Sequence, residues 1–150
     1  MKVAILSGSV YGTAEEVARH AEGVLKKAGL DAWHNPRASL EDVLAFGPES
    51  FLVVTSTTGM GELPDNLQPL YYAIRDRLPA WHGQPGGVIA LGDSSYGDTY
   101  CAGGEQVREL FAELGVLEVL PMLRVDASES VTPEQDAEPW LAEFVNALRS

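Results

Sequence analysis

Hydroxyl side chains and glycines cluster near the N-terminus with a spacing that suits the binding of an anion. The segment Ser7–Ala14 reads Ser-Gly-Ser-Val-Tyr-Gly-Thr-Ala. It follows the apolar run 3–6 and opens an amphipathic stretch, so we expect it to be the turn between a strand and a helix. Such a turn directs backbone N–H groups and the positive end of the helix dipole toward one point. We expect a phosphate there, held by neutral donors because the segment contains no Lys or Arg.

The common nucleotide-binding motifs do not describe this segment. It lacks the Gly-Lys-Ser/Thr ending of a P-loop and the glycine spacing of the dinucleotide fingerprint. The alternative is a structural Ser/Gly turn in which Thr13 and Glu16 form a capping box at the start of the helix. The eight residues alone leave both interpretations open.

Two further loops have a similar composition. Residues 56–66 read Ser-Thr-Thr-Gly-Met-Gly-Glu-Leu-Pro-Asp-Asn, and residues 92–101 read Gly-Asp-Ser-Ser-Tyr-Gly-Asp-Thr-Tyr-Cys. Gly59 and Gly61 permit a close approach of the backbone to a flat ligand. The tyrosines of the second loop can offer a ring face for stacking. Together with the phosphate segment, these loops describe a site for a phosphorylated planar ring.

The elements that carry these loops alternate between apolar runs and amphipathic stretches. Strands are expected at residues 3–6, 30–34, 51–55, 87–91 and 117–125. Helices are expected at residues 13–28, 67–78, 107–114 and 140–148, with a helical turn or irregular link at 39–46. Pro121 interrupts the last strand and favours an edge position for it.

This alternation predicts an α/β fold with a doubly wound, five-stranded parallel sheet and helices on both faces. The common strand order for five strands is 2-1-3-4-5, and ligands bind where that order reverses, between strands 1 and 3. The three unusual loops follow expected strands 1, 3 and 4, so they meet at this edge of the sheet. No linker or repeat divides the chain, and we expect one domain over residues 1–150.

Taken in order, the three motifs resemble those of the flavodoxin family. They read Ser-Gly-Ser-x-Tyr-Gly-Thr, Ser-Thr-Thr-Gly-x-Gly-x-x-Pro-Asp-Asn and Leu-Gly-Asp-Ser-Ser-Tyr, and the likeness covers nearly the whole chain. The chain resembles in particular the small bacterial flavodoxins of the MioC and YqcA type. It is similar to the short-chain form, since strand 5 carries no long insertion. The resemblance implies a flavodoxin-like sheet, tight non-covalent FMN and one-electron transfer.

The resemblance also implies which residues bind FMN. The phosphate segment would contribute Ser7, Gly8, Ser9, Tyr11, Gly12, Thr13 and Ala14. One face and the N5 edge of the ring would meet Thr57, Thr58, Gly59, Met60 and Gly61. The third loop would contribute Gly92, Asp93, Tyr96, Asp98, Thr99, Tyr100 and Cys101, with Tyr96 stacked on the other ring face. Asp126 is expected near the rim of the site.

The sequence departs from the family pattern at two places. Thr58 stands where many relatives have an aromatic residue, so one flavin face would lack an aromatic cover that Met60 partly replaces. The stretch 96–101 is one residue longer than in the family pattern, and we expect Gly97 to accommodate the extra residue. Acidic residues of the loops would disfavour the anionic reduced flavin and lower its potential; they are Glu62, Asp65, Asp93 and Asp98.

Composition and charge limit the class of protein. The formal net charge is −12, which argues against nucleic acid and anionic membranes as partners and favours proteins with basic faces. No apolar run approaches the roughly 20 residues that span a bilayer. The single cysteine excludes an internal disulfide and fits a reducing compartment. The three histidines have no metal-ligand spacing. We expect a cytoplasmic monomer without a metal.

The preferred function is therefore an FMN-dependent one-electron carrier between a reductase and an acceptor enzyme, with no catalytic side chain of its own. One alternative is a phosphate- or nucleotide-binding module on the same fold without a redox role. Another is an NAD(P)H-dependent quinone reductase, although the sequence offers no second nucleotide site.

Overall fold

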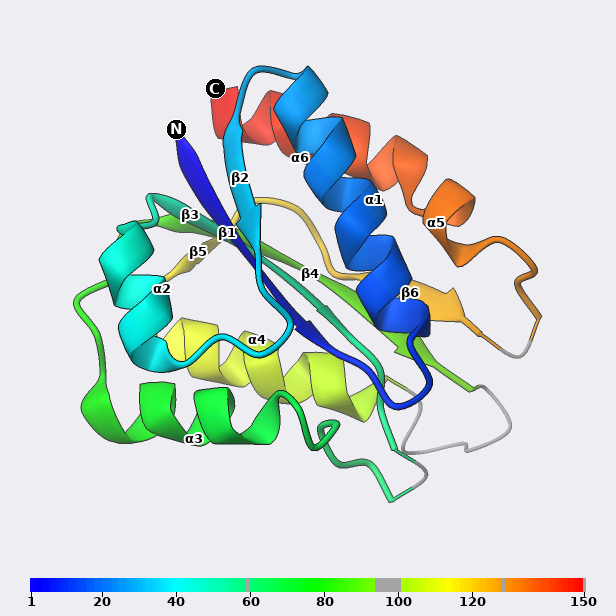
Figure 1. The fold of residues 1–150 in the computed structure, drawn as a ribbon, viewed down its shortest axis with the longest axis horizontal. Helices are drawn as coiled ribbons and strands as arrows, with labels where there is room; N and C mark the ends of the chain where they lie inside the picture. The colour runs from blue at the N-terminus through cyan, green and yellow to red at the C-terminus, as the bar shows by residue number, and fades with distance from the viewer. Residues whose placement is uncertain (59, 94–100, 128, 150) are drawn as a thin grey trace.

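The computed structural model describes residues 1–58, 60–93, 101–127 and 129–149. The strands are β1 (Lys2–Gly8), β2 (Asp31–His34), β3 (Ser50–Thr55), β4 (Pro85–Gly92), β5 (Leu117–Glu118) and β6 (Leu123–Asp126). The helices are α1 (Thr13–Lys27), α2 (Leu40–Phe46), α3 (Gln68–Arg77), α4 (Ala102–Leu114), α5 (Pro133–Asp136) and α6 (Glu138–Arg149). Figure 1 shows the sheet between two layers of helices.

All strand pairs are parallel, and the order is β2-β1-β3-β4-β5, which confirms the predicted doubly wound sheet. The prediction of one strand over 117–125 was wrong. This segment forms two short strands, β5 and β6, and both pair with β4. Pro121 lies in the gap between them and has no N–H to continue the ladder. Its carbonyl instead accepts a hydrogen bond from the Trp140 indole at 2.8 Å.

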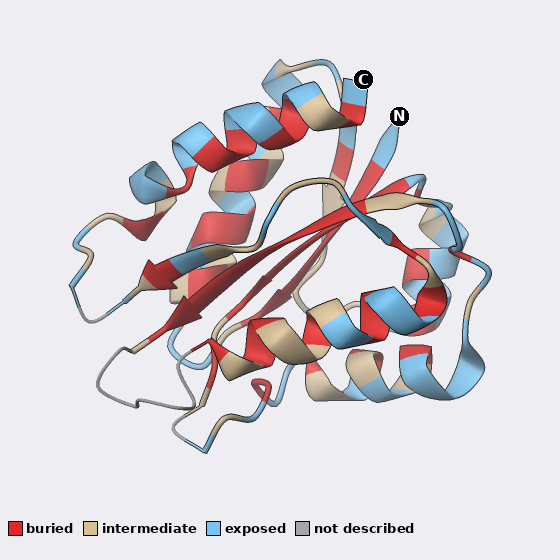
Figure 2. Cartoon of the chain, turned by 180° about the vertical axis from the view of Figure 1, so that it is seen from behind, coloured by how far each residue is buried: buried red, intermediate tan, exposed pale blue. Residues whose placement is uncertain are grey.

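Two apolar layers hold the helices on the sheet, and successive residues of β1 point alternately into each. Val3 and Ile5 face α1 and α6, whereas Ala4 and Leu6 face α2, α3 and α4. Strands β1, β3 and β4 are buried along most of their length (Figure 2). Such complete burial explains why they appear in the sequence as continuous apolar runs rather than alternating ones.

Several helix boundaries differ from the expectation. Helix α4 begins at Ala102 and α6 at Glu138, in both cases before the first expected residue. The segment 39–46 is a true helix, because Ser39 and Asp42 form a capping box at its start. The helix expected over 67–78 ends at Arg77, and Leu78 is 60% exposed rather than buried. Pro79 follows Leu78 and disfavours the helical conformation for the residue before it. Leu78 accordingly has a φ of 45°.

Helix α1 begins at Thr13 as expected, although its cap is not the one that the sequence offered as an alternative. Its N-cap is Gly12, with a φ of 91°, and Thr13 is the first helical residue. The alternative capping box of Thr13 and Glu16 is therefore wrong, because Thr13 lies inside the helix and no side chain of the described residues caps this end. The positive φ suits glycine and turns the chain sharply from β1 into α1.

The carboxyl ends of β1, β3 and β4 meet at one edge of the sheet, while both chain termini lie at the opposite edge (Figure 1). Among the described residues, no helix has the length and apolar character needed to cross a membrane.

Candidate functional site

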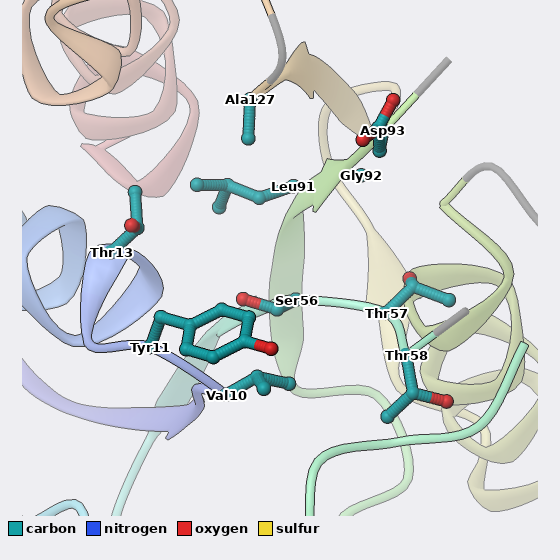
Figure 3. A pocket seen from close by; sticks show the side chains of 10 residues that line it. All are labelled: Val10, Tyr11, Thr13, Ser56, Thr57, Thr58, Leu91, Gly92, Asp93 and Ala127. Atoms are coloured by element: carbon teal, nitrogen blue, oxygen red, sulfur yellow. The ribbon is translucent and has the colours of Figure 1, made fainter. Parts of the chain in front are cut away.

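A pocket of about 340 Å³ lies at the carboxyl ends of the central strands, within the size range of small-molecule sites. Its lining residues are Val10, Tyr11, Thr13, Ser56, Thr57, Thr58, Leu91, Gly92, Asp93 and Ala127. They come from the ends of β1, β3, β4 and β6 and converge on one space (Figure 3). The described residues at the start of the three loops that the sequence singled out thus meet at the switch point of the sheet.

The first wall of the pocket is the start of α1. The first hydrogen bond of this helix runs from the Glu16 N–H to the Gly12 carbonyl at 3.0 Å. The N–H groups of Thr13, Ala14 and Glu15 consequently have no acceptor among the described residues. Because these amides and the helix dipole point the same way, this end of α1 attracts an anion.

Hydrogen bonds within the segment 7–14 fix its shape. The Ser9 hydroxyl accepts from the Gly12 N–H at 2.7 Å, and the Ser9 N–H donates to Asn66 Oδ1 at 2.8 Å. Gly8 has no room for a side chain, because a Cβ would lie 2.8 Å from Thr55 Oγ1. The loop therefore depends on close packing as well as on its hydroxyls.

Ser7 lies apart from the other hydroxyls. Its Oγ is 2.8 Å from His34 Nε2 on the neighbouring strand β2, and the residue is only 3% exposed. Burial lowers the pKa of His34 below its ordinary value of 6.5; Glu22 and Glu15 oppose this effect and Arg19 adds to it. This pair underlies the loop and does not line the pocket.

The second wall is the loop after β3, which closes on itself. The Thr58 N–H donates to the Glu62 carbonyl, and the Gly61 N–H donates to the Thr58 carbonyl, each at 2.9 Å. Gly61 has a φ of 81°, which this tight turn requires. Thr58 lines the pocket, whereas the side chain of Met60 is turned to solvent and is 83% exposed.

Helix α4 anchors this loop from the other side. Thr57 Oγ1 accepts from the Gly103 N–H at 3.0 Å, and Gln106 Nε2 donates to the Gly61 carbonyl at 2.7 Å. Gly103 allows the approach, because a Cβ there would lie 2.8 Å from the Ser56 carbonyl oxygen. The Thr57 hydroxyl thus accepts from α4 and keeps its own O–H as a donor at the pocket wall.

The third wall is the end of β4. Gly92 and Asp93 line the pocket, and the Gly92 carbonyl accepts from the Ala127 N–H at 2.7 Å. Cys101 is fully buried as the N-cap of α4, with its Sγ 3.6 Å from the Ala90 carbonyl oxygen. Asp126 belongs to a different surface hollow, beside Glu129 and Asp136.

Several predicted site residues lie outside the described residues, so their positions stay predictions. These are Gly59, Tyr96, Asp98, Thr99 and Tyr100. Within the described ranges, no group of three or more His, Cys, Asp or Glu side chains could hold a metal ion.

Sequence reasoning missed the residues that hold the loops together. Asn66 ends the second motif and Gln106 lies on α4. The residues next to them in the sequence give no signal that predicts a long-range hydrogen bond. Arg37 was also missed. It lines a second pocket of about 210 Å³ with Ser9, Gly12 and the carboxylate Glu15, and so places a cation beside a loop that has none of its own.

The family of the chain follows from comparison with known proteins. A family model described as Flavodoxin matches residues 5–140. The chain belongs to the flavodoxin family. A protein of Pseudomonas aeruginosa, PA3435, is 82% identical over 149 residues, which cover 99% of each chain. Flavodoxin YqcA of Escherichia coli K12 is 41% identical over 147 residues, which cover 98% of each chain.

A solved flavodoxin has nearly the same backbone. The C101A mutant of flavodoxin from Pseudomonas aeruginosa is 81% identical, covers 100% of both chains and has a TM-score of 0.98. Flavodoxins are electron-transfer proteins with a flavin, which supports an electron-carrier role for this chain. The residues present suit a flavin nucleotide, because unpartnered amides at α1 adjoin a pocket with apolar and hydroxyl walls.

Proposed function

We propose that this flavodoxin is a single domain that binds FMN at the pocket and carries single electrons between a reductase and an acceptor enzyme. One observation carries the proposal: the start of α1, with its unpartnered N–H groups, borders the pocket through Thr13. A ligand with a phosphate at one end and a flat ring at the other matches both features.

The phosphate would be held by the N–H groups of Thr13 and Ala14 and by the hydroxyls of Ser9 and Thr13. Two phosphate charges would be stabilised by the helix dipole and by neutral donors. Ser7 would act indirectly, since its hydroxyl pairs with His34 and its carbonyl accepts from Asn66. The positive charge of Arg37, which lines the second pocket, would attract the phosphate over a longer distance.

The ring would lie between the walls formed by Tyr11, Thr58 and Asp93, which all line the pocket. Gly59, Met60, Gly61 and Gly92 would allow the backbone to approach it, and Tyr96 would stack on its second face. Asp98, Thr99, Tyr100 and Cys101 would lie toward its far edge. Bound FMN supplies the one-electron chemistry, and these residues orient it and keep water from its faces.

Electron exchange requires that part of the ring reach the surface. Three apolar side chains stand at or beside the pocket mouth with large exposed fractions: Tyr11 at 95%, Met60 at 83% and Val10 at 45%. Asp93 lies on the wall of the same pocket, in a chain of net charge −12. We therefore propose that the redox partners dock with basic faces, and that attraction between unlike charges speeds their encounter.

The test is reconstitution followed by electron relay. Purified protein is loaded with FMN, and we expect one flavin per chain with an altered visible absorption spectrum. Adding an NADPH-dependent flavodoxin reductase and cytochrome c should then give cytochrome reduction that depends on the loaded chain. Failure to bind FMN would overturn the proposal. NADPH consumption by the chain and a quinone without any reductase would instead indicate a quinone reductase.

A further inference from the structure

Asn66 connects three separate loops at the phosphate end of the site. Its Oδ1 accepts from the Ser9 N–H at 2.8 Å, and its Nδ2 donates to the Ser7 carbonyl at 3.1 Å and to the Pro36 carbonyl at 3.0 Å. Ser7 lies near the end of β1, Ser9 follows that strand and Pro36 follows β2. Asn66 itself lies just before α3. These contacts span 57, 59 and 30 residues of sequence.

The partners determine which way the Asn66 amide is turned. A backbone N–H can only donate and a backbone carbonyl can only accept, so the side-chain oxygen must face Ser9 and the nitrogen must face the two carbonyls. Among uncharged side chains, only an amide offers an acceptor and two donors in one plane. Asparagine therefore fits this position because its amide provides both the acceptor and the two donors that the three partners require.

The bond to Ser9 shapes the anion-binding turn. It occupies the Ser9 N–H, and the Ser9 hydroxyl in turn accepts from the Gly12 N–H at 2.7 Å. Gly12 is the N-cap of α1, so this chain of contacts reaches the point where the free amides of the helix begin. Asn66 also lines the second pocket, together with Arg37.

We propose that Asn66 is a positioning residue that holds the segment 7–14 in its phosphate-binding form without touching the ring. This inference rests on the proposed function, because it names the residue that sets the FMN phosphate subsite. The ring-side loop has separate anchors on α4, from Thr57 to Gly103 and from Gln106 to Gly61. Loss of Asn66 should therefore weaken phosphate binding and leave ring binding unchanged.

The experiment compares FMN with riboflavin, which carries the same ring but no phosphate. In Asn66→Ala we expect the FMN affinity to fall about tenfold and the riboflavin affinity to stay within about twofold. The matched control is Gln68→Ala, at the end of the same connection. Gln68 is the first residue of α3, and within the described residues its side-chain amide donates to the Leu63 carbonyl, at 2.7 Å. This control should leave the FMN-to-riboflavin ratio as in the wild type.

A readout without ligand separates this inference from the proposed function. In the unloaded protein, amide hydrogen exchange at Ser9 should speed up in Asn66→Ala by more than exchange at the core strand amides, which reports any loss of global stability. Asn66→Asp has the same shape and retains the acceptor for Ser9, so it serves if the alanine variant does not fold. It loses both donors, and its FMN affinity should also fall selectively.

The outcomes are distinct. Wild-type protein that ignores FMN would overturn the proposed function. Unchanged Ser9 exchange in Asn66→Ala would overturn the role of Asn66, and so would an equal loss of FMN and riboflavin affinity in either folded variant.

Discussion

The phosphate end of the pocket, at residues 7–14, and its ring end, at residues 56–62, both follow a buried strand, yet they are fixed differently. The phosphate end is tied to the neighbouring loops by Asn66. It ends in a helix whose first amides have no acceptor in the part of the chain that the structure describes. The ring end is a closed turn supported by α4, and its tip carries an exposed Met60.

This difference separates two tasks. A phosphate is recognised by fixed donors, so the donors must be held still before the ligand arrives. A ring that exchanges electrons must meet a partner, so its surroundings include exposed apolar side chains. We infer that changes at the phosphate end alter which flavin is bound, whereas changes at the ring end alter how tightly any flavin is held and at what potential.

The largest effect is expected from Thr13→Asp. A carboxylate at the first position of α1 would repel the phosphate, and FMN affinity should fall about 100-fold, with riboflavin affected much less. The fold should not suffer, because a negative charge in the first turn stabilises a helix by about 0.3–1 kcal/mol. Thr13→Asn has a similar shape without the charge and is the control. Equal losses in the two variants would contradict an electrostatic origin.

A smaller effect is expected from Gln106→Ala, which removes the contact between α4 and Gly61. Losing one hydrogen bond of about 1 kcal/mol should weaken FMN and riboflavin about fivefold each and leave their ratio unchanged. Titration of both flavins measures this, with the exposed Gln135→Ala on α5 as the control. A change in the ratio would mean that the two ends of the pocket are coupled.

Asp93→Asn should raise the potential at which bound flavin takes its second electron. Removing a negative charge from the pocket wall favours the more negative reduced state, and a shift of about 30–60 mV corresponds to about 0.7–1.4 kcal/mol. Potentiometric titration measures it. Glu143→Gln removes the same charge from the exposed side of α6 and should shift the potential much less. A similar shift in both variants would contradict a local effect.

The smallest effect is expected from the histidine beneath the phosphate end. The pKa of His34 is lowered by burial, so the unfolded chain takes up a proton more readily than the folded chain. Stability should therefore fall as the pH drops below about 6.5, the ordinary histidine pKa. His34→Gln, which can still pair with Ser7, should lose less stability over pH 7.5 to 5. Urea unfolding at several pH values measures the unfolding free energy of both proteins. If the free energy falls equally in the wild type and in His34→Gln as the pH drops, His34 does not cause the loss.

The sequence predicted the strand order and the meeting of the loops because both follow from local signals. Buried parallel strands leave continuous apolar runs, and the switch point follows from their order. The broken strand at Pro121 and the early end of α3 before Pro79 were misjudged by a few residues. In both cases a proline decided the boundary against an otherwise regular apolar pattern.

The supports of the site could not be predicted in the same way. Asn66, Gln106 and His34 act on residues 27 to 59 positions away, and such contacts exist only once the sheet has brought the loops together. The hydroxyls of Ser7 and Thr57 illustrate the same limit. Their types suggested ligand contacts, which stay predictions, and did not announce the protein partners that the fold gives them.

A crystal structure of the chain loaded with FMN tests the central claim most directly. The account predicts the phosphate at the start of α1, with oxygens about 2.7–3.2 Å from the N–H groups of Thr13 and Ala14. It also predicts the ring in the pocket between Tyr11 and Thr58. A phosphate bound in the second pocket beside Arg37, with those two amides left unbonded, would contradict it.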